Sequence, residues 1–179
     1  MYKQKSIYDK STFKIIQHNE YDADGNLLFQ QTYDEYSNLL ELLYDTTHYT
    51  RYTYGFNKNV IKSIEQSGAL TTTKHYNHLG SLIYNEYGYH SQNIYKIMYS
   101  NTCIYRPSDN NLIYSEDNKG AWNKYEYHDQ PNVFGIYPIK SIIKSDDTAL
   151  FYTNSGEMDN PRTDKHILKN MLKDPHIKS

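Results

Sequence analysis

The feature that most constrains the fold of this chain is a short unit, led by tyrosine, that recurs along it. Four copies align on Tyr21, Tyr33, Tyr54 and Tyr76. Asp, Asn or Gly follows each tyrosine, and two aliphatic residues stand at the sixth and seventh positions after it. Tyrosine and branched aliphatic residues favour strands, whereas Asp, Asn and Gly favour tight turns. Each copy therefore predicts a strand that ends on the tyrosine, a turn, and a return strand.

The spacing of the copies indicates how the strands are arranged. Tyr33, Tyr54 and Tyr76 lie 21 or 22 residues apart, which fits two strands and two turns per unit. Second turns are expected at 45–47 and 66–68, where turn-forming residues separate two strand-like runs. Two weaker copies follow, in which Tyr127 leads to Asn132, Val133 and Phe134, and Tyr105 leads to Asn111, Leu112 and Ile113 after one inserted residue. We predict an all-β antiparallel meander of hairpin repeats, forming an open curved sheet.

The aromatic composition fits a thin sheet that faces water. The 179 residues include 21 Tyr but only 5 Phe and one Trp. Tyrosine combines a large apolar ring with a polar tip, so it can pack on a sheet and still face water. We expect tyrosines to replace part of a conventional aliphatic core.

The end of the chain carries a different pattern. Asn160-Pro161 is a good helix start, and Ile167, Leu168, Met171 and Leu172 fall on one helical face before Asp174-Pro175. This pattern predicts a short helix over 161–173, with a frayed tail as the alternative. The expected division is a β-repeat sheet over 1–158 and, over 159–179, a helix and tail that pack on the sheet or cap it.

The repeats resemble the YD repeats of Rhs-type and teneurin-type proteins, which run Tyr-Asp, two variable residues, Gly, then Asn-Leu or Arg-Leu. The match is complete over 21–27; the copy that begins at Tyr33 departs at Ser37, and the copy at Tyr76 departs at Asn77 and Ser81. The resemblance is clear over 21–89, faint to about 135, and absent beyond. It implies β-hairpin sheets without a catalytic residue, and a short stand-alone member of such a family, such as an immunity protein of a polymorphic toxin system.

The residues that could support chemistry do not form a known catalytic or metal-binding pattern. His75 and His78 are three residues apart but flank a turn, and a zinc site needs three or four ligands. Cys103 is the single cysteine and stands in a strand-like run, which favours a buried structural thiol. Adjacent residues such as Asp146 and Asp147 point to opposite faces of a strand. We therefore expect no enzyme activity, no metal and no cofactor.

The charge pattern suggests where a partner binds. Seven acidic residues and no Lys or Arg lie between residues 19 and 50, although the whole chain has a net charge of -2. One interpretation is ordinary turn acids in water; the other is an acidic, tyrosine-rich surface that attracts a basic partner. The residues expected to contact the partner are Asp22, Asp24, Asp34, Glu35, Tyr36, Glu41, Tyr44, Asp45, Tyr49 and Tyr52. Nucleic acid is not expected as a partner, because it would require the opposite charge.

The functional hypothesis is a protein-binding module, most specifically an immunity protein that neutralises a cognate bacterial toxin by occluding it. The absence of a signal-like or membrane-spanning apolar segment predicts a cytoplasmic location and no membrane partner. The alternative is a surface or secreted carbohydrate-binding module, in which exposed Tyr side chains and Trp122 stack on sugar rings. A fragment of a larger Rhs shell is a third possibility, which the predicted terminal helix disfavours.

Overall fold

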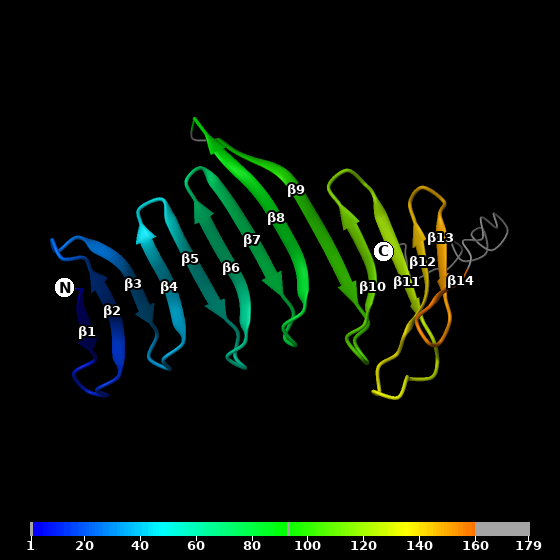
Figure 1. The fold of residues 1–179 in the computed structure, drawn as a ribbon, viewed down its shortest axis with the longest axis horizontal. Helices are drawn as coiled ribbons and strands as arrows, with labels where there is room; N and C mark the ends of the chain where they lie inside the picture. Colours follow the sequence, from blue (N-terminus) through cyan, green and yellow to red (C-terminus); the bar gives the residue numbers. More distant parts are fainter. Residues whose placement is uncertain (1, 93, 160–179) are drawn as a thin grey trace. The chain divides into compact units, whose positions relative to one another are not determined.

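The computed structural model describes residues 2–92 and 94–159, and within them the chain forms strands, turns and loops only. Each strand is hydrogen-bonded to the strands before and after it in the chain (Figure 1). The strands are β1 (Lys3–Tyr8), β2 (Ile15–Tyr21), β3 (Leu27–Tyr33), β4 (Leu39–Asp45), β5 (His48–Tyr54), β6 (Val60–Ser67), β7 (Leu70–Tyr76), β8 (Leu82–Ser91), β9 (Ile94–Tyr105), β10 (Leu112–Asp117), β11 (Trp122–Tyr127), β12 (Ile139–Lys144), β13 (Ala149–Tyr152) and β14 (Met158–Asp159). The prediction of an all-β antiparallel meander is confirmed. The predicted helix over 161–173 lies outside the described residues.

Contacts divide the chain into two compact units, Met1–Ser100 and Asn101–Ser179. Unit 1 contains β1 to β8 and the start of β9, and the pairings from β1 to β8 are antiparallel. Unit 2 contains the end of β9 and the strands that follow, which also pair antiparallel. The division predicted from the sequence, after residue 158, falls at the end of the described residues and stays a prediction.

The repeated unit has one geometry, and it explains the two aliphatic residues. Tyr54 pairs with Val60, whereas Thr53 pairs with Lys62, so that Ile61 is left over as a β-bulge. The same shift leaves one residue unpaired in the other copies, because Tyr21 pairs with Leu27, Tyr33 with Leu39 and Tyr76 with Leu82. The first aliphatic residue therefore closes the loop opposite the tyrosine, and the second is the bulged residue.

The backbone conformation of the turns confirms the alignment of the four copies at the fourth residue after the tyrosine. Backbone φ is 90° at Gly25, 67° at Ser37, 62° at Lys58 and 86° at Gly80. Only this left-handed conformation closes the loop, and glycine adopts it without the steric cost that a side chain adds. The second turns lie at 46–47, between β4 and β5, and at 68–69, between β6 and β7, so the turn predicted at 66–68 begins two residues later than predicted.

The copies alternate between the two edges of the sheet in a way that the sequence alignment did not predict. Tyr21 and Tyr33 are separated by one strand, β3, so their loops lie on opposite edges. The four strands β1, β3, β5 and β7 all arrive at one edge of unit 1, and they end on Tyr8, Tyr33, Tyr54 and Tyr76. We call this edge, with its loops 9–14, 34–38, 55–59 and 77–81, the tyrosine edge; it is the lower edge in Figure 1. Tyr8 belongs to the series, with a loop one residue longer than 34–38, and the sequence alignment missed it.

Unit 2 confirms one of the weaker copies and corrects the other. Tyr105 pairs with Leu112, as the aligned copy predicts, and Ile113 is the bulged residue. Tyr127, however, pairs with Ile139 rather than with Val133. Val133 and Phe134 lie in the loop between β11 and β12, which is longer than the repeat because it contains a second turn that closes at Gly135 with φ of 75°.

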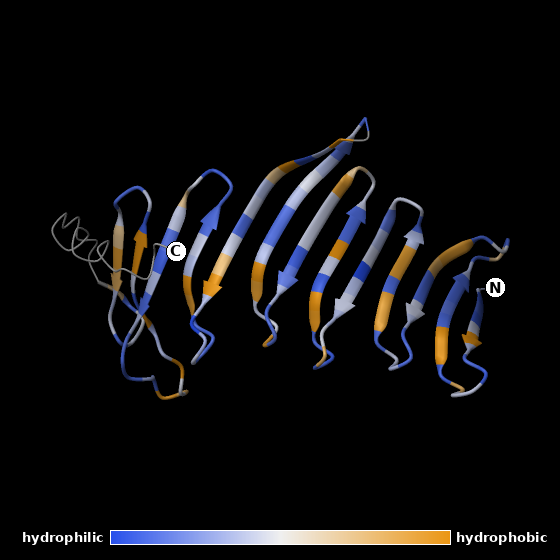
Figure 2. Cartoon of the chain, turned by 180° about the vertical axis from the view of Figure 1, so that it is seen from behind, coloured by the Kyte–Doolittle hydropathy of each residue, from blue (hydrophilic) through white to orange (hydrophobic). Residues whose placement is uncertain are grey.

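The two units differ in how they bury side chains. In the described part of unit 1, the buried residues are Asn19, Thr71 and Gly88, and no apolar side chain is fully buried. Unit 2 contains a small core of Ile143 and Ala149, against which Trp122 and Phe151 pack. Apolar segments of unit 1 form short bands along the strands rather than a continuous layer (Figure 2). The expected thin, water-facing sheet is therefore what unit 1 forms.

Candidate functional site

Three of the four loops of the tyrosine edge are held by an aspartate or asparagine at their first position, and the exception is the loop that begins at Gly55. Asp34 Oδ1 accepts hydrogen bonds from the N–H groups of Tyr36 (2.9 Å) and Asn38 (2.8 Å), and its Oδ2 accepts one from Asn38 Nδ2 (2.8 Å). Desolvation would raise the pKa of Asp34, but the bonds from Asn38 and Tyr36 outweigh it, so the pKa is lowered. Asn77 holds the next loop in the same way, through the N–H groups of Leu79 and Ser81. These polar side chains build loops of fixed shape.

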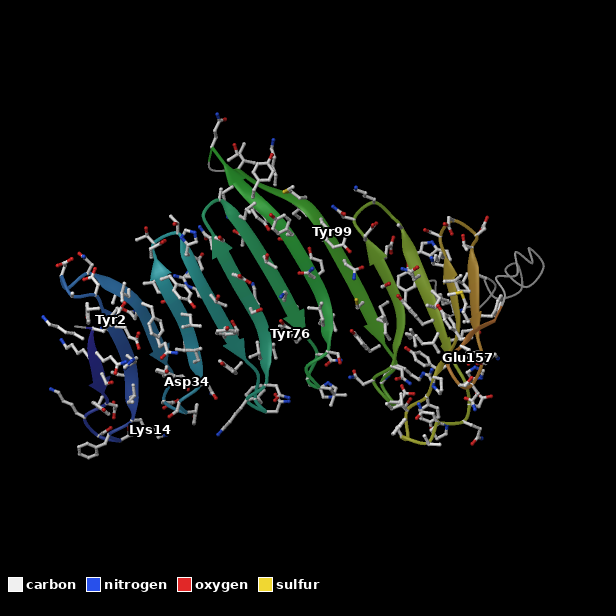
Figure 3. The ribbon with its side chains drawn as sticks, in the orientation of Figure 1. Tyr2, Lys14, Asp34, Tyr76, Tyr99 and Glu157 are labelled. Carbon is white, nitrogen blue, oxygen red and sulfur yellow. The ribbon has the colours of Figure 1, made fainter. Side chains whose placement is uncertain are left out.

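Neighbouring loops of the tyrosine edge are also tied to one another. Lys14 Nζ donates to the main-chain oxygen of Glu35 (2.8 Å), and Figure 3 shows Lys14 and Asp34 on these neighbouring loops. Asn57 Nδ2 and Asn59 Nδ2 donate to the main-chain oxygen of His78 at 2.8 and 2.9 Å. These bonds link the first loop to the second and the third loop to the fourth, which gives the edge a defined surface.

The loop tips of the tyrosine edge present large apolar side chains to solvent. Phe13 is 79% exposed, Tyr36 59%, Phe56 112% and Leu79 55%. Each residue stands on a different loop, and neighbouring loops are separated by two strands, or about 10 Å. A row of exposed apolar residues in such a polar chain is typical of an interaction surface.

A groove of about 660 Å³ lies between the second and third loops of this edge. Three aromatic rings, an aliphatic side chain and three polar side chains line it together with one glycine: Asp34, Tyr36, Asn38, Tyr54, Gly55, Phe56, Lys58 and Ile61. The Tyr54 hydroxyl donates to the main-chain oxygen of Leu39 (2.8 Å), which fixes this ring against the neighbouring hairpin. Lys58 Nζ lies 5.4 Å from the centre of the Tyr36 ring, across the groove. The negative charge of Glu35 and a hydrogen bond with it raise the pKa of the Tyr36 hydroxyl, which therefore stays protonated at neutral pH.

The ten residues predicted to contact a partner are spread over both faces and both edges of unit 1. Asp34 and Tyr36 line the groove, and Glu35 stands between them on the same loop. Asp22 and Asp24 stand on a loop of the opposite edge, where Asp22 accepts hydrogen bonds from Asp24 and Asn26. Asp45 is on that opposite edge too.

The remaining acidic residues of the set have partners within the sheet. Asp45 accepts hydrogen bonds from the Thr47 N–H and hydroxyl and contacts His48, and the Thr47 bonds lower the pKa of Asp45 to about 2. Glu41 forms an ion pair with Arg51 across the β4–β5 pairing. The acidic segment therefore does not form a single charged surface, because its carboxylates are dispersed and several are engaged.

The remaining tyrosines of the set lie on different faces. Arg51 stacks over the Tyr49 ring at 4.3 Å, on one face of β5. Tyr52 lies on the other face, because successive strand residues point to opposite sides. There it lines a smaller polar basin of about 260 Å³ with Ser63, Glu65 and Lys74 among others. Tyr44 stacks on Phe29 at 6.2 Å.

The sequence prediction missed Phe13, Phe56, Lys58 and Leu79. The repeat predicts a turn at each of these positions, where polar residues are expected. An apolar or long side chain in such a turn is the sequence signal that could have identified them.

In the part of the chain that the structure describes, no group of three or more His, Cys, Asp and Glu side chains could hold a metal ion. Cys103 is half-buried; burial raises the pKa of its thiol, and Asn101 Nδ2 contacts its sulfur at 3.3 Å. Within the described ranges, no helix has the length and apolar character to cross a bilayer.

Neither a protein-family model nor a curated protein matches the sequence. Among solved structures, the chain is similar to one from the crystal structure of TcdB2-TccC3-TEV, with 11% sequence identity and a TM-score of 0.48. The similarity covers 90% of this chain and 10% of that one, so this chain spans about a tenth of the length of the protein it matches.

Proposed function

We propose that this chain is a protein-binding module that contacts its partner through the tyrosine edge of unit 1. The observation that carries the proposal is the row of exposed apolar loop tips, Phe13, Tyr36, Phe56 and Leu79. Aromatic side chains that are exposed in the free protein and held on rigid loops are the usual anchors of protein interfaces. Because the first loop is bonded to the second and the third to the fourth, little ordering is required on binding.

The most specific form of this proposal is an immunity protein that neutralises a cognate bacterial toxin by covering its active site or substrate groove. The YD-like motif of the repeats, from Tyr21-Asp22 to Tyr76-Asn77, supports it by resemblance. In this role the chain acts in the cytoplasm by occupying a surface, without catalysis, metal or cofactor. A stable complex of this kind buries about 1,200–2,000 Å² in total.

The direct test is co-expression with the toxin encoded beside this gene. We expect the chain to co-purify with the toxin and to rescue growth of the cells. A variant with Phe13, Tyr36, Phe56 and Leu79 all replaced by serine should lose both effects while keeping the sheet, because none of the four side chains is buried. A matched control changes Ile94 and Met98, which are also exposed but belong to β9 rather than to these loops. Rescue that survives the four loop substitutions would refute the tyrosine edge as the interface.

A second candidate function is carbohydrate binding, and the groove is the observation that favours it. Tyr36 and Phe56 are exposed rings beside Asp34 and Asn38, and such rings can stack on the apolar face of a sugar. Retention on a glycan array, lost in Tyr36→Ala and Phe56→Ala, would favour this function over toxin neutralisation.

A further inference from the structure

The polar groups that line the groove are mostly engaged within the protein. The Asp34 carboxylate accepts three hydrogen bonds, and the Asn38 side chain donates one of them. The Tyr54 hydroxyl donates to a main-chain oxygen. A sugar site needs several directed hydrogen bonds to hydroxyl groups, and this lining leaves few groups free to make them. The groove is therefore better suited to an apolar group than to a polyhydroxylated one.

Lys58 is the exception among the lining residues. Its ammonium group lies over the Tyr36 ring, which is a weak contact at an exposed site. Within the described residues, Lys58 is in none of the ion pairs. This cation can therefore turn toward an incoming carboxylate at little cost.

The backbone at Lys58 makes this side chain unusual. Its φ is 62°, and the equivalent position is glycine in the copies led by Tyr21 and Tyr76. A side chain in this conformation has a steric cost that glycine does not have. Glycine is therefore a substitution that removes the ammonium group without harming the loop, which makes Lys58 well suited to an experimental test.

We infer that the groove is an anchor pocket for a large apolar side chain of a protein partner, in which a neighbouring carboxylate of the partner pairs with Lys58. This inference rests on the proposed protein-binding function and identifies the chemistry that the interface recognises. The rings of Tyr36, Tyr54 and Phe56 supply the apolar contact, and the ammonium group supplies the charge complementarity. It differs from the basic partner expected from sequence, because the acids behind that expectation are dispersed and several are engaged.

The experiment uses small probes of the two chemical features and the full-length chain. N-acetyl-L-phenylalanine carries an aromatic ring beside a carboxylate, and its amide is the same molecule without the charge. Binding is followed by the NMR shifts of the backbone amides. We expect both probes to shift residues 34–38 and 55–59, with the acid binding about 2–5-fold more tightly than the amide, the effect of one exposed ion pair.

Three variants assign the effect to the groove. Lys58→Gly should remove the difference between acid and amide, whereas Lys58→Arg should keep it. Phe56→Ala should weaken both probes equally. Lys10→Ala, which removes an exposed cation from the loop 9–14, is the matched control and should change neither affinity.

Several outcomes would overturn the inference: equal affinity for acid and amide in the unchanged protein, tighter binding of the amide, shifts outside the two loops, or groove binding of N-acetylglucosamine in place of the two probes. These outcomes can be separated from failure of the proposed function. If the probes fail but the four-serine variant still loses the toxin, only the anchor chemistry is wrong; if that variant keeps the toxin, the interface itself is wrong.

Discussion

Each unit contains a groove at the same position of the repeat, and the two grooves differ in charge. In unit 1 the groove contains Tyr54, whose hydroxyl donates to Leu39 oxygen at 2.8 Å; in unit 2 Tyr127 donates to Leu112 oxygen at 2.8 Å. The unit 2 groove has about 340 Å³ and is lined by Arg106, Ser108, Asp109, Tyr127, His128, Asp129 and Tyr137. The first loop of each groove follows Tyr33 in unit 1 and Tyr105 in unit 2. The residue after that tyrosine is Asp34 in unit 1 and Arg106 in unit 2.

The cations of the two grooves are in different situations. Arg106 in unit 2 forms an ion pair with Asp109 at 3.2 Å and lies 5.5 Å from the Tyr127 ring, so its charge is already balanced. Lys58 in unit 1 has the aromatic contact with Tyr36 and no such pair among the described residues. The same scaffold, with the same tyrosine bond, can therefore present a groove whose cation is ion-paired or a groove whose cation is not. Only the sequence of the loops decides which.

The largest effect that tests this contrast concerns the core that unit 2 has and unit 1 lacks. Ile143→Ala should cost about 2–4 kcal/mol of unfolding free energy, because the side chain is fully buried against Trp122 and Phe151. Ile64→Ala in β6 should cost about half as much, because that side chain is half-buried. Urea unfolding followed by fluorescence of Trp122, the single tryptophan, reports on unit 2, and amide exchange of β3 to β8 reports on unit 1. Equal losses in the two variants would mean that the units do not differ in packing.

The next effect is acid lability, which should be greater in unit 1. The pKa is lowered for Asp9, Asp22, Asp34 and Asp45 of unit 1, mainly by loop hydrogen bonds, but in unit 2 a lowered pKa is found only for Asp146 of the described residues. A carboxyl group with a lowered pKa stabilises the fold above its unfolded value near 3.8 and loses this contribution as the pH falls through its folded value. Between about pH 4 and pH 2, amide protection in unit 1 should therefore fall before Trp122 fluorescence changes. Simultaneous transitions would contradict this expectation.

The repeat explains which parts of the fold could be predicted from the sequence. The strand end at Tyr54 and the return strand that begins at Val60 follow from local chemistry, and the structure confirms them, whereas the bulge at Ile61 was not predicted. The edge on which each copy lies depends on the number of strands between copies. Tyr21 and Tyr33 are 12 residues apart with one strand between their loops, so these loops lie on opposite edges. The groove was not predictable, because it requires loops 34–38 and 55–59 to meet across two strands.

The predicted partner-binding set illustrates a second limit. A run of acids without cations suggests a charged surface, yet Arg51 lies just beyond the run and pairs with Glu41 across the β4–β5 pairing. Asp22 and Asp34 act mainly as turn builders. Charge counted along a chain does not predict charge on a sheet, since pairing brings distant residues side by side.

A smaller effect tests whether the two grooves share one supporting bond. Tyr54→Phe and Tyr127→Phe each remove one hydroxyl that donates to a main-chain oxygen, and each should cost about 1 kcal/mol of unfolding free energy. The rings and their packing are kept, so probe binding in unit 1 should change little. Urea unfolding of the two variants under the same conditions measures both losses. If one loss is near zero, the two grooves are not held in the same way.

The smallest effect concerns loops in which a residue other than glycine takes the left-handed conformation. Ser37 in unit 1 has φ of 67° and Asp147 in unit 2 has φ of 63°, and both donate through their N–H groups to the residue three positions earlier. Ser37→Gly should stabilise unit 1 by about 0.5–1 kcal/mol, because the steric cost of a side chain at positive φ is relieved, in part offset by greater chain entropy in the unfolded state. Asp147→Gly should gain less, since aspartate tolerates this conformation better than most residues. Thermal unfolding of both variants measures the difference, with Gly80→Ser as the reverse change, expected to lose about what Ser37→Gly gains. If Asp147→Gly gains more stability than Ser37→Gly, the residue type does not set the strain at positive φ. The strain at Lys58 would then not come from its side chain at positive φ.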